Sequence, residues 1–458
     1  MKGTSMSIAR RLDAALTRRQ LMAWSAGGLA AALLPRTGRG AISGKKVVVV
    51  GAGMAGMTAA KYLRLWGGSG LQVTLVEPET LYTSNIMSNL VLNGSRSVGS
   101  LRYARDTLVT KYGVQRITGS VASLNPGART VTLADGTPLA YDRLVLAPGV
   151  SFDEAYGLTQ ADYDTRTPHA WRAGAQTTLL RNQLVAMRNG DTFVMSIPKA
   201  PYRCPPGPYE RACVVADYLK KAKGSNCRVL VLDENPVIQA ERHTFEQAFG
   251  QIHAGVVRYE AGISGLRIDA ANRQLSYLDA VLAPHSVQAQ AINPIPPHRA
   301  QGSAPGGWLA QAGLNNSADG RWAVVDVLSY ESTALPGSGI HVIGDAASCG
   351  LPKAGHVANQ EAKICADAIV RLLQNGQPDP QPVANSACYS PITASTASWL
   401  TATYQYDPAE HKMKPATAGG KTVVNGVPAT AIESAAIDSD NFKNMGTWFR
   451  TLMSDTLG

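Results

Sequence analysis

The apolar positions of this chain fall in short continuous runs that alternate with longer segments of mixed polarity. Residues 45–50 form a β-branched run, which predicts a buried parallel strand, and residues 72–76 predict a second one. Residues 57–66 between them are compatible with a helix. Strand, helix and strand in this order predict a βαβ unit with a parallel sheet.

A second α/β unit follows, so we predict an α/β fold with two Rossmann-like domains of the dinucleotide-binding type. A hairpin over residues 129–147, which leads into a strand, is expected between the two units. Beyond residue 380 the periodicity is weak, and Pro, Ala, Ser and Thr are frequent. The helices and strands expected in the second unit alternate along residues 173–187, 192–197, 210–223 and 228–232.

Composition excludes several classes of protein. Apolar residues make up 45% of the 458 residues and charged residues 17%, which excludes a disordered chain. No run of 18 apolar residues occurs, so we expect no transmembrane span. Residues 1–41 hold seven Lys and Arg against one acid, which leaves a net charge of only +4 for the rest. No basic cluster with interleaved aromatic residues remains, so no nucleic-acid partner is expected.

The basic N-terminal segment resembles an export signal. Arg18-Arg19 precedes a short apolar stretch at residues 23–34 and a small-residue segment at residues 37–41. This order predicts a twin-arginine signal over residues 1–41 and a periplasmic location, because that route exports folded, cofactor-loaded proteins. An N-terminal helix of the mature protein is the alternative.

The first predicted strand runs directly into a glycine-rich loop at residues 51–56, with the sequence GAGMAG. Glycines allow a tight turn and a close approach of the backbone to a pyrophosphate, and the following helix offers free N–H groups. Glu77 ends the second strand, where an acid accepts from ribose hydroxyls. The sequence therefore predicts a dinucleotide site at Gly51, Gly53, Ala55, Gly56 and Glu77.

Later segments favour a flavin. Residues 340–345 predict a strand that ends in Gly344-Asp345, whose carboxylate can accept from a ribityl hydroxyl. The helix expected after Gly355 would point its N-terminus at the flavin. Lys353 either stabilises a flavin anion or caps a turn. The predicted cofactor is FAD, and the added site residues are Ala147, Pro148, Gly149, Gly344, Asp345, Lys353 and Gly355.

The second unit lacks a phosphate loop. Residues 202–210 read YRCPPGPYE where glycines would be required. Three prolines and bulky neighbours cannot cradle a pyrophosphate. We therefore expect no nicotinamide cofactor in this unit.

The chain contains six cysteines: Cys204, Cys213, Cys227, Cys349, Cys365 and Cys388. An oxidising compartment permits disulfides, but the count alone selects no pairing. Their spacings fit no zinc template, so no metal is expected.

These motifs together resemble the flavoprotein subunit of flavocytochrome c sulfide dehydrogenase, which is related to sulfide:quinone oxidoreductases in the disulfide-oxidoreductase flavoprotein superfamily with its glutathione-reductase-like fold. The segment at residues 200–212, APYRCPPGPYERA, is the most specific match. Further matches are residues 51–56, 168–171, 295–297, 341–345 and 387–390.

The resemblance implies a redox-active disulfide between Cys204 and Cys388 beside the flavin. Cys349 is the alternative partner. For Glu210 the resemblance implies an acid/base role. Its place in the chain equally allows it to cap the helix that begins there. Arg203 is expected to favour a Cys204 thiolate. The resemblance also implies a cytochrome c subunit as partner.

One departure concerns the flavin link. The family typically attaches FAD through a cysteine in a Tyr-Thr-Cys stretch, whereas residues 82–85 read Tyr-Thr-Ser-Asn here. We therefore predict FAD bound without a covalent link, with Ser84 and Asn85 beside it.

The resemblance and the residues predict a periplasmic FAD-dependent sulfide dehydrogenase that passes electrons to cytochrome c. The alternatives are a peripheral sulfide:quinone oxidoreductase and an accessory flavoprotein that acts on a sulfur-carrier protein. The expected organisation is a signal at 1–41, an FAD domain at 42–150 and 313–380, a second Rossmann-like domain at 151–312, and a C-terminal interface region at 381–458.

Residues 442–457 predict a last helix with Phe442, Met445, Phe449 and Leu452 on one face and Trp448 beside it. Three interpretations of this apolar face are open. It is expected to pack on the protein's own core, to dock on a partner subunit or to lie on a membrane surface.

Overall fold

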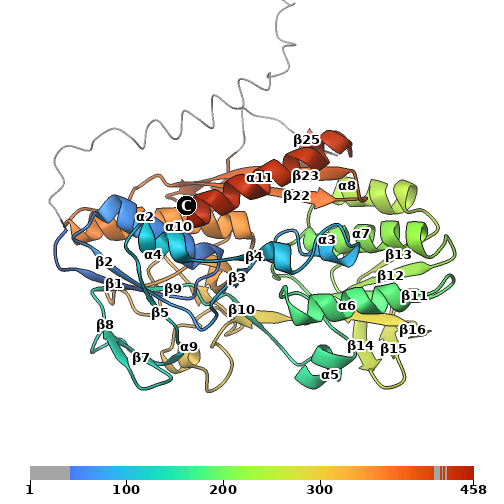
Figure 1. The fold of residues 1–458 in the computed structure, drawn as a ribbon, viewed down its shortest axis with the longest axis horizontal. Helices are drawn as coiled ribbons and strands as arrows, with labels where there is room; N and C mark the ends of the chain where they lie inside the picture. The colour runs from blue at the N-terminus through green and yellow to red at the C-terminus, as the bar shows by residue number, and fades with distance from the viewer. Residues whose placement is uncertain (1–41, 417–422, 425–426, 429–430) are drawn as a thin grey trace, which may run out of the picture. The chain divides into compact units, whose positions relative to one another are not determined.

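The computed structural model describes residues 42–416, 423–424, 427–428 and 431–458 (Figure 1). The predicted export signal lies outside these residues. Within them, no helix has the length and apolar character needed to cross a membrane.

The first parallel sheet has five strands in the order β20-β9-β1-β2-β5. Its central strand is the predicted β-branched run, in which four of five residues are buried. The strand predicted before Gly344 joins this sheet at the edge, beside β9. Helices α2 (Met54–Gly67) and α10 (Gly355–Leu373) pack on one another. The strands are β1 (Lys46–Val50), β2 (Gln72–Val76), β5 (Gln115–Ile117), β9 (Arg143–Leu146) and β20 (Ile340–Val342).

The second parallel sheet has the order β13-β12-β11-β17. Its two central strands are almost wholly buried, as expected for strands covered on both faces. The fold is thus a mixed α/β fold with two Rossmann-like units, as predicted. The elements are β11 (Thr192–Ile197), β12 (Arg228–Asp233), β13 (Val257–Ala261), β17 (Ala291–Pro294), α6 (Ala175–Ala186) and α7 (Gly207–Ala222).

The hairpin expected over residues 129–147 forms and leads into a strand as predicted, with a break inside its second arm. That arm divides into β8 (Pro138–Ala140), in an antiparallel sheet with β6 (Val121–Asn125) and β7 (Thr130–Leu133), and β9 in the parallel sheet. Asp142 marks the division, because its carboxylate accepts from the Lys46 amide at 2.8 Å and its own amide donates to Lys46 O.

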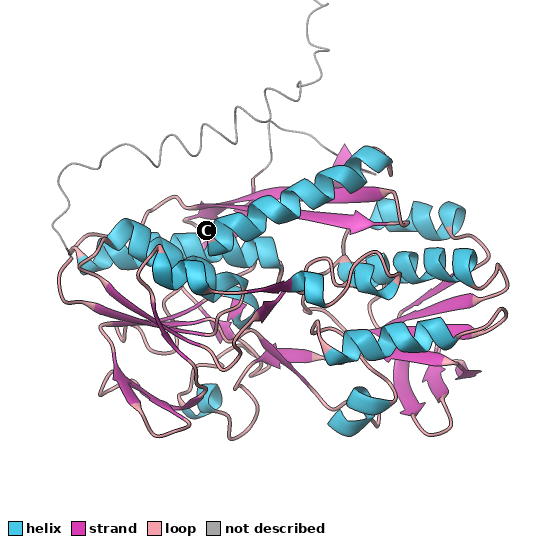
Figure 2. Cartoon of the chain, viewed as in Figure 1, coloured by secondary structure: helices cyan, strands magenta, loops and turns pink. Residues whose placement is uncertain are grey.

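A C-terminal sheet occupies the region where periodicity is weak. Strands β22 (Val383–Pro391) and β23 (Ala397–Asp407) form a long antiparallel hairpin, which β24 (Lys412–Pro415) and β27 (Ile432–Glu433) extend. Helix α11 (Ser439–Leu457) lies lengthwise along these strands (Figure 2). Met445, Phe449 and Leu452 are buried, so the apolar face of the predicted last helix packs on the protein's own core.

Short elements complete the described chain. A two-stranded pairing of β10 with β18 connects the two units. The remaining elements are β3 (Tyr82–Thr83), β4 (Arg102–Tyr103), β10 (Val150–Phe152), β14 (Ser264–Asp269), β15 (Gln274–Leu278), β16 (Pro284–Gln288), β18 (His298–Ala300), β19 (Ala323–Val324), β21 (Ala347–Ser348), β25 (Val423–Val424), β26 (Val427–Pro428), α3 (Asn89–Leu92), α4 (Asp106–Thr110), α5 (Gln160–Thr165), α8 (Arg242–Gln247) and α9 (Trp308–Gln311).

Candidate active site

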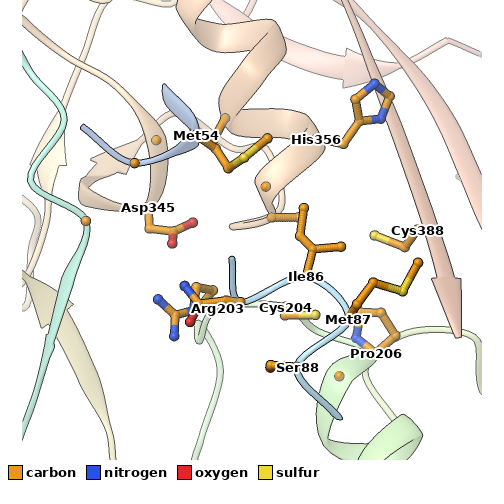
Figure 3. A pocket seen from close by; sticks show the side chains of 18 of the residues that line it. Met54, Ile86, Met87, Ser88, Arg203, Cys204, Pro206, Asp345, His356 and Cys388 are labelled. Atoms are coloured by element: carbon orange, nitrogen blue, oxygen red, sulfur yellow. The ribbon is translucent and has the colours of Figure 1, made fainter. Parts of the chain in front are cut away.

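A cavity lies where the first unit, the start of α7 and the C-terminal sheet meet (Figure 3). Its walls come from the glycine loop, residues 85–89, the start of α7, the start of α10, strand β22 and helix α11. Of the residues predicted to bind the cofactor, these line it: Gly53, Ala55, Asn85, Ala147, Gly149, Gly344, Asp345 and Gly355.

The glycine loop is shaped by close backbone contacts. A methyl group on Gly51 would lie 2.3 Å from Ala147 O, and one on Gly56 would lie 1.8 Å from Gly51 O. Gly53 has no atom within 4 Å of that position, and no side chain caps α2. Free N–H groups at the start of a long helix beside an open glycine fit a pyrophosphate. Gly51 and Gly56 therefore hold the loop, while Gly53 faces the cavity.

Glu77 braces this loop. Its carboxylate accepts from the Ala52 amide at 2.7 Å and from the Glu79 amide at 3.1 Å. The buried Arg105 donates to the carbonyl oxygens of Glu79, at 2.7 Å, and of Ala52. Sequence reasoning missed Arg105, because a single arginine outside any motif carries no signal.

Lys353 does not line the cavity. Its ammonium donates to the carbonyl oxygens of Asp345 and Ala347 at 2.9 and 2.7 Å and lies 3.9 Å from the centre of the Trp322 ring. Of the two interpretations left open, turn capping matches this geometry. Pro148 lies outside the lining as well, and the buried Ser84 hydroxyl donates to Ile86 O at 3.2 Å.

Asp345 and Arg203 face one another in the cavity (Figure 3). Burial raises the pKa of Asp345, while Arg203 and Lys353 lower it. Nη2 of Arg203 is buried without a hydrogen-bond partner among the described residues. An unpaired donor beside a carboxylate suits a ligand that carries both acceptors and hydroxyl donors, as a flavin dinucleotide does.

Cys204 and Cys388 both line the cavity, and Figure 3 shows both side chains pointing into it. Both are free thiols in this structure, so the disulfide between them stays a prediction. Cys204 has φ +60° and its amide donates to Lys353 O at 2.7 Å. Cys349 lies outside the cavity lining, with its thiol 3.1 Å from the Glu361 carboxylate, which argues against it as the alternative partner.

The expected lowering of the Cys204 pKa is wrong. Desolvation and the nearby Glu210 raise the pKa of this thiol to about 12, and the opposing effect of Arg203 is smaller. Desolvation also raises the pKa of Cys388, and Cys204 and two glutamates add to the effect. A thiolate formed here requires either a proton acceptor nearby or a disulfide as its source.

Glu210 lies in the first turn of α7 but caps no backbone N–H. Its Oε1 accepts from Asn89 Nδ2 at 2.9 Å, and burial raises its pKa to about 8. The fully buried Arg211 donates to Asn89 Oδ1 at 2.8 Å and has its pKa lowered to about 9 by burial. The acid/base interpretation of Glu210 therefore fits its position, and the capping interpretation does not.

In the second unit, the acid at the end of β12 is hydrogen-bonded to side chains of that same unit. Asp233 at the end of β12 accepts from the hydroxyls of Tyr209 and Tyr259 at 2.7 and 2.9 Å. Its other oxygen accepts from Asn235. The acid that would hold a ribose is thus occupied, which agrees with the missing phosphate loop.

Aromatic residues surround one side of the cavity. Trp448 of α11 lies 5.5 Å from the Tyr389 ring and 6.3 Å from the His356 ring, and all three line the cavity. Sequence reasoning placed Trp448 beside the apolar face of its helix without a role in the site.

The chain is similar to known flavoproteins over limited stretches. The ferredoxin reductase component of chlorobenzene dioxygenase from Cupriavidus sp. (strain PS12) is 37% identical over 109 residues, 22% of this chain and 25% of that protein. Rubredoxin-NAD(+) reductase from Pseudomonas putida is 29% identical over 107 residues, 23% of this chain and 28% of that protein. The chain thus matches about a quarter of the length of these relatives.

The fold is similar over a longer span. The sulfide:quinone oxidoreductase from Aquifex aeolicus superposes with a TM-score of 0.69 and 18% identity, covering 90% of this chain and 91% of that one. Putidaredoxin reductase, in its complex with putidaredoxin, gives a TM-score of 0.57 and 19% identity over 79% and 82% of the two chains. These structures have the same fold as this protein.

Two family descriptions match adjoining parts of the chain. Residues 45–186 match "Pyridine nucleotide-disulphide oxidoreductase" and residues 177–296 match "Sulfide dehydrogenase [flavocytochrome c] flavoprotein chain, central". These matches indicate FAD as the cofactor, which the glycine loop and the cavity beside it fit. Residues 177–296 are therefore similar to the central region of the flavocytochrome c sulfide dehydrogenase flavoprotein chain, and the residues before them are similar to a pyridine nucleotide-disulphide oxidoreductase domain.

Proposed function

We propose that this protein oxidises hydrosulfide to sulfane sulfur through a Cys204–Cys388 disulfide and passes the electrons through FAD to cytochrome c. The observation that carries the proposal is the meeting of two cysteines, distant in the chain, in the cavity that the glycine loop opens into. An electrophilic sulfur pair and a two-electron acceptor are what the oxidation requires.

The chemistry begins at the disulfide. Hydrosulfide attacks one sulfur and forms a persulfide, while the other cysteine leaves as a thiolate. A second hydrosulfide attacks the outer sulfur of the persulfide and removes it as hydrodisulfide, leaving both cysteines reduced. Bound FAD supplies the two-electron acceptor that allows the pair to return to the disulfide.

Glu210 manages the proton in this sequence. Because its pKa is about 8, the carboxyl is largely protonated at neutral pH and can donate to the leaving sulfur. Asn89 donates a hydrogen bond to the Glu210 carboxylate and accepts one from Arg211, so these two residues orient the carboxyl. Arg203 stabilises negative charge on Cys204, as its opposing effect on the thiol pKa indicates.

The acceptor and the location are part of the proposal. A cytochrome c subunit fits the flavocytochrome c description of residues 177–296. The twin-arginine pattern at Arg18-Arg19 supports export to the periplasm. FAD is proposed to bind without a covalent link, because serine occupies position 84.

A quinone acceptor is the second candidate. The aromatic wall formed by His356, Tyr389 and Trp448 favours it, because a flat apolar ring could stack there. An accessory role on a sulfur-carrier protein would use the same cysteines with little turnover of free sulfide.

Anaerobic mixing tests these functions. Sulfide is added to the purified flavoprotein while the flavin absorbance is followed, and oxidised cytochrome c or a soluble quinone is added next. Bleaching followed by cytochrome reduction, both lost in Cys204→Ser and in Cys388→Ser, is the expected result. A flavin that stays oxidised with sulfide would refute sulfide oxidation. Reduction of the quinone without reduction of cytochrome c would make a quinone the electron acceptor.

A further inference from the structure

A buried carboxyl lies behind Cys388 and has no role in the chemistry above. Glu241 is only 2% exposed and has φ +50°, a left-handed conformation that glutamate rarely adopts. Its Oε1 accepts from the Ser390 hydroxyl at 2.7 Å, whereas Oε2 has no hydrogen-bond partner within the described residues. A buried carboxyl with one orphaned oxygen and no ion pair in the described chain is suited to holding a proton.

The register of the C-terminal sheet connects this carboxyl with the thiol. Cys388 and Ser390 are two residues apart on β22, so their side chains share one face of the sheet. Ser398 pairs directly with Ser390, and Leu400 pairs with both Cys388 and Glu433, which places Ser398 and Glu433 on that same face. One face of the sheet thus carries the thiol, two hydroxyls and a second carboxyl.

Hydrogen bonds continue this row towards the surface. Ser398 Oγ lies 3.1 Å from Thr244 Oγ1, which donates to Glu433 Oε2 at 3.0 Å. Ser390, Ser398 and Thr244 are buried, whereas Glu433 is partly exposed. Hydroxyls both donate and accept, so such a row can transfer a proton by successive exchange.

The groups that face Glu241 are anionic or neutral. They are Glu433 from β27, Glu210 and Cys213 from α7, and Cys388 from β22. Burial raises the pKa of Glu241 to about 8; the hydroxyls of Ser390 and Ser398 oppose this rise, and Glu433 and Glu210 add to it. The carboxyl can therefore bind and release a proton near neutral pH.

We propose that Glu241, held by Ser390, receives the proton that leaves the Cys204–Cys388 pair and passes it through Ser398 and Thr244 to Glu433 at the surface. Converting two hydrosulfide ions into one hydrodisulfide ion releases two electrons and one proton. The electrons go to FAD and then to the acceptor, and the proton leaves by this row. Glu241 holds the proton and passes it on. This role rests on the redox-active cysteine pair of the proposed function.

The test separates the relay from sulfide oxidation. Anaerobically reduced holoprotein, freed of reductant, is mixed with excess ferricyanide, which takes four electrons in all. Two electrons and one proton leave the anionic reduced flavin, and two electrons and two protons leave the two thiols. Flavin absorbance and a pH-indicator dye are followed together in the wild type, Glu241→Gln and Thr244→Val. Glu246→Gln is the matched control, because this exposed side chain pairs with Arg242 on the surface of the same helix.

The wild type and Glu246→Gln are expected to release protons in step with flavin oxidation. In Glu241→Gln and Thr244→Val, proton release should lag, by a factor on the order of a hundred. Proton release in Glu241→Gln at the rate of Glu246→Gln would overturn the relay. If sulfide fails to bleach any variant while the lag persists with ferricyanide, sulfide oxidation is refuted and the relay stands.

Discussion

A single methyl group placed on Gly207 tests the geometry of the cysteine site. Gly207 begins α7, and its Cβ would lie 2.8 Å from Cys204 Sγ and 3.0 Å from the edge of the Trp171 ring. No unusual φ is required at this position, so the effect of Gly207→Ala is steric. Trp171 is held by a hydrogen bond from Nε1 to Arg203 O at 3.0 Å, which leaves the thiol as the part that moves.

The expected magnitude follows from these contacts. Overpacking of this kind costs about 1–3 kcal/mol of unfolding free energy. A displacement of the reacting sulfur approaching 1 Å lowers the rate on the order of a hundredfold. Gly207→Ala should therefore remain folded while the disulfide chemistry of Cys204 slows far more than stability changes.

The assay compares Gly207→Ala with Gly250→Ala. The control site lies in the same unit and has no atom within 4 Å of the added methyl group. Thermal unfolding gives the stability of each variant, and stopped-flow bleaching by sulfide gives the rate. A folded Gly207→Ala protein that bleaches as fast as Gly250→Ala would refute the inferred position of the sulfur.

Further outcomes follow from the same site. Bleaching by sulfide should slow as the pH rises through about 8, where Glu210 loses its proton, and Glu210→Gln should lose that pH dependence. Because the native state keeps this proton to a higher pH than the unfolded chain, the free energy of unfolding should fall between about pH 4.5 and 8, with a smaller slope in Glu210→Gln. Arg211→Met should cost about 3–5 kcal/mol in denaturant unfolding, because it leaves three buried acceptors unpaired, Asn89 Oδ1, Asn293 Oδ1 and Ala170 O. Acid precipitation should release FAD into the supernatant, since position 84 is serine, and retention in the pellet would contradict this. Addition of NADH should leave the flavin absorbance unchanged, because the hydroxyls of Tyr209 and Tyr259 already donate hydrogen bonds to the Asp233 carboxylate.

Local patterns were enough to predict much of the fold. The run before the glycine loop is a central parallel strand because β-branched side chains suit a strand covered on both faces. The C-terminal hairpin escaped prediction, since its burial alternates along β22 only in the first residues and then becomes continuous. The hairpin packs on α7, α10 and α11, of which α7 and α11 are distant along the chain.

The chemistry of the site divides in the same way. The GAGMAG loop and the PPGP turn are visible in the sequence because glycine and proline restrict the backbone locally. The pKa of Cys204 was predicted in the wrong direction, because the neighbouring Arg203 is visible in the sequence whereas desolvation is not. Lys353 likewise has the charge for a flavin contact but is committed to two backbone carbonyls.

The sequence was sufficient to predict features that belong to short segments. These are the alternation of strands and helices along the chain, the dinucleotide loop and the absence of a second phosphate loop. The joining of Cys204 and Cys388 in one cavity, the raised pKa of Glu210 and the row from Glu241 to Glu433 depend on folding. Each requires burial or contact between segments far apart in the chain. Desolvation and long-range contacts are set by the whole packed structure, and no local pattern of residues encodes them.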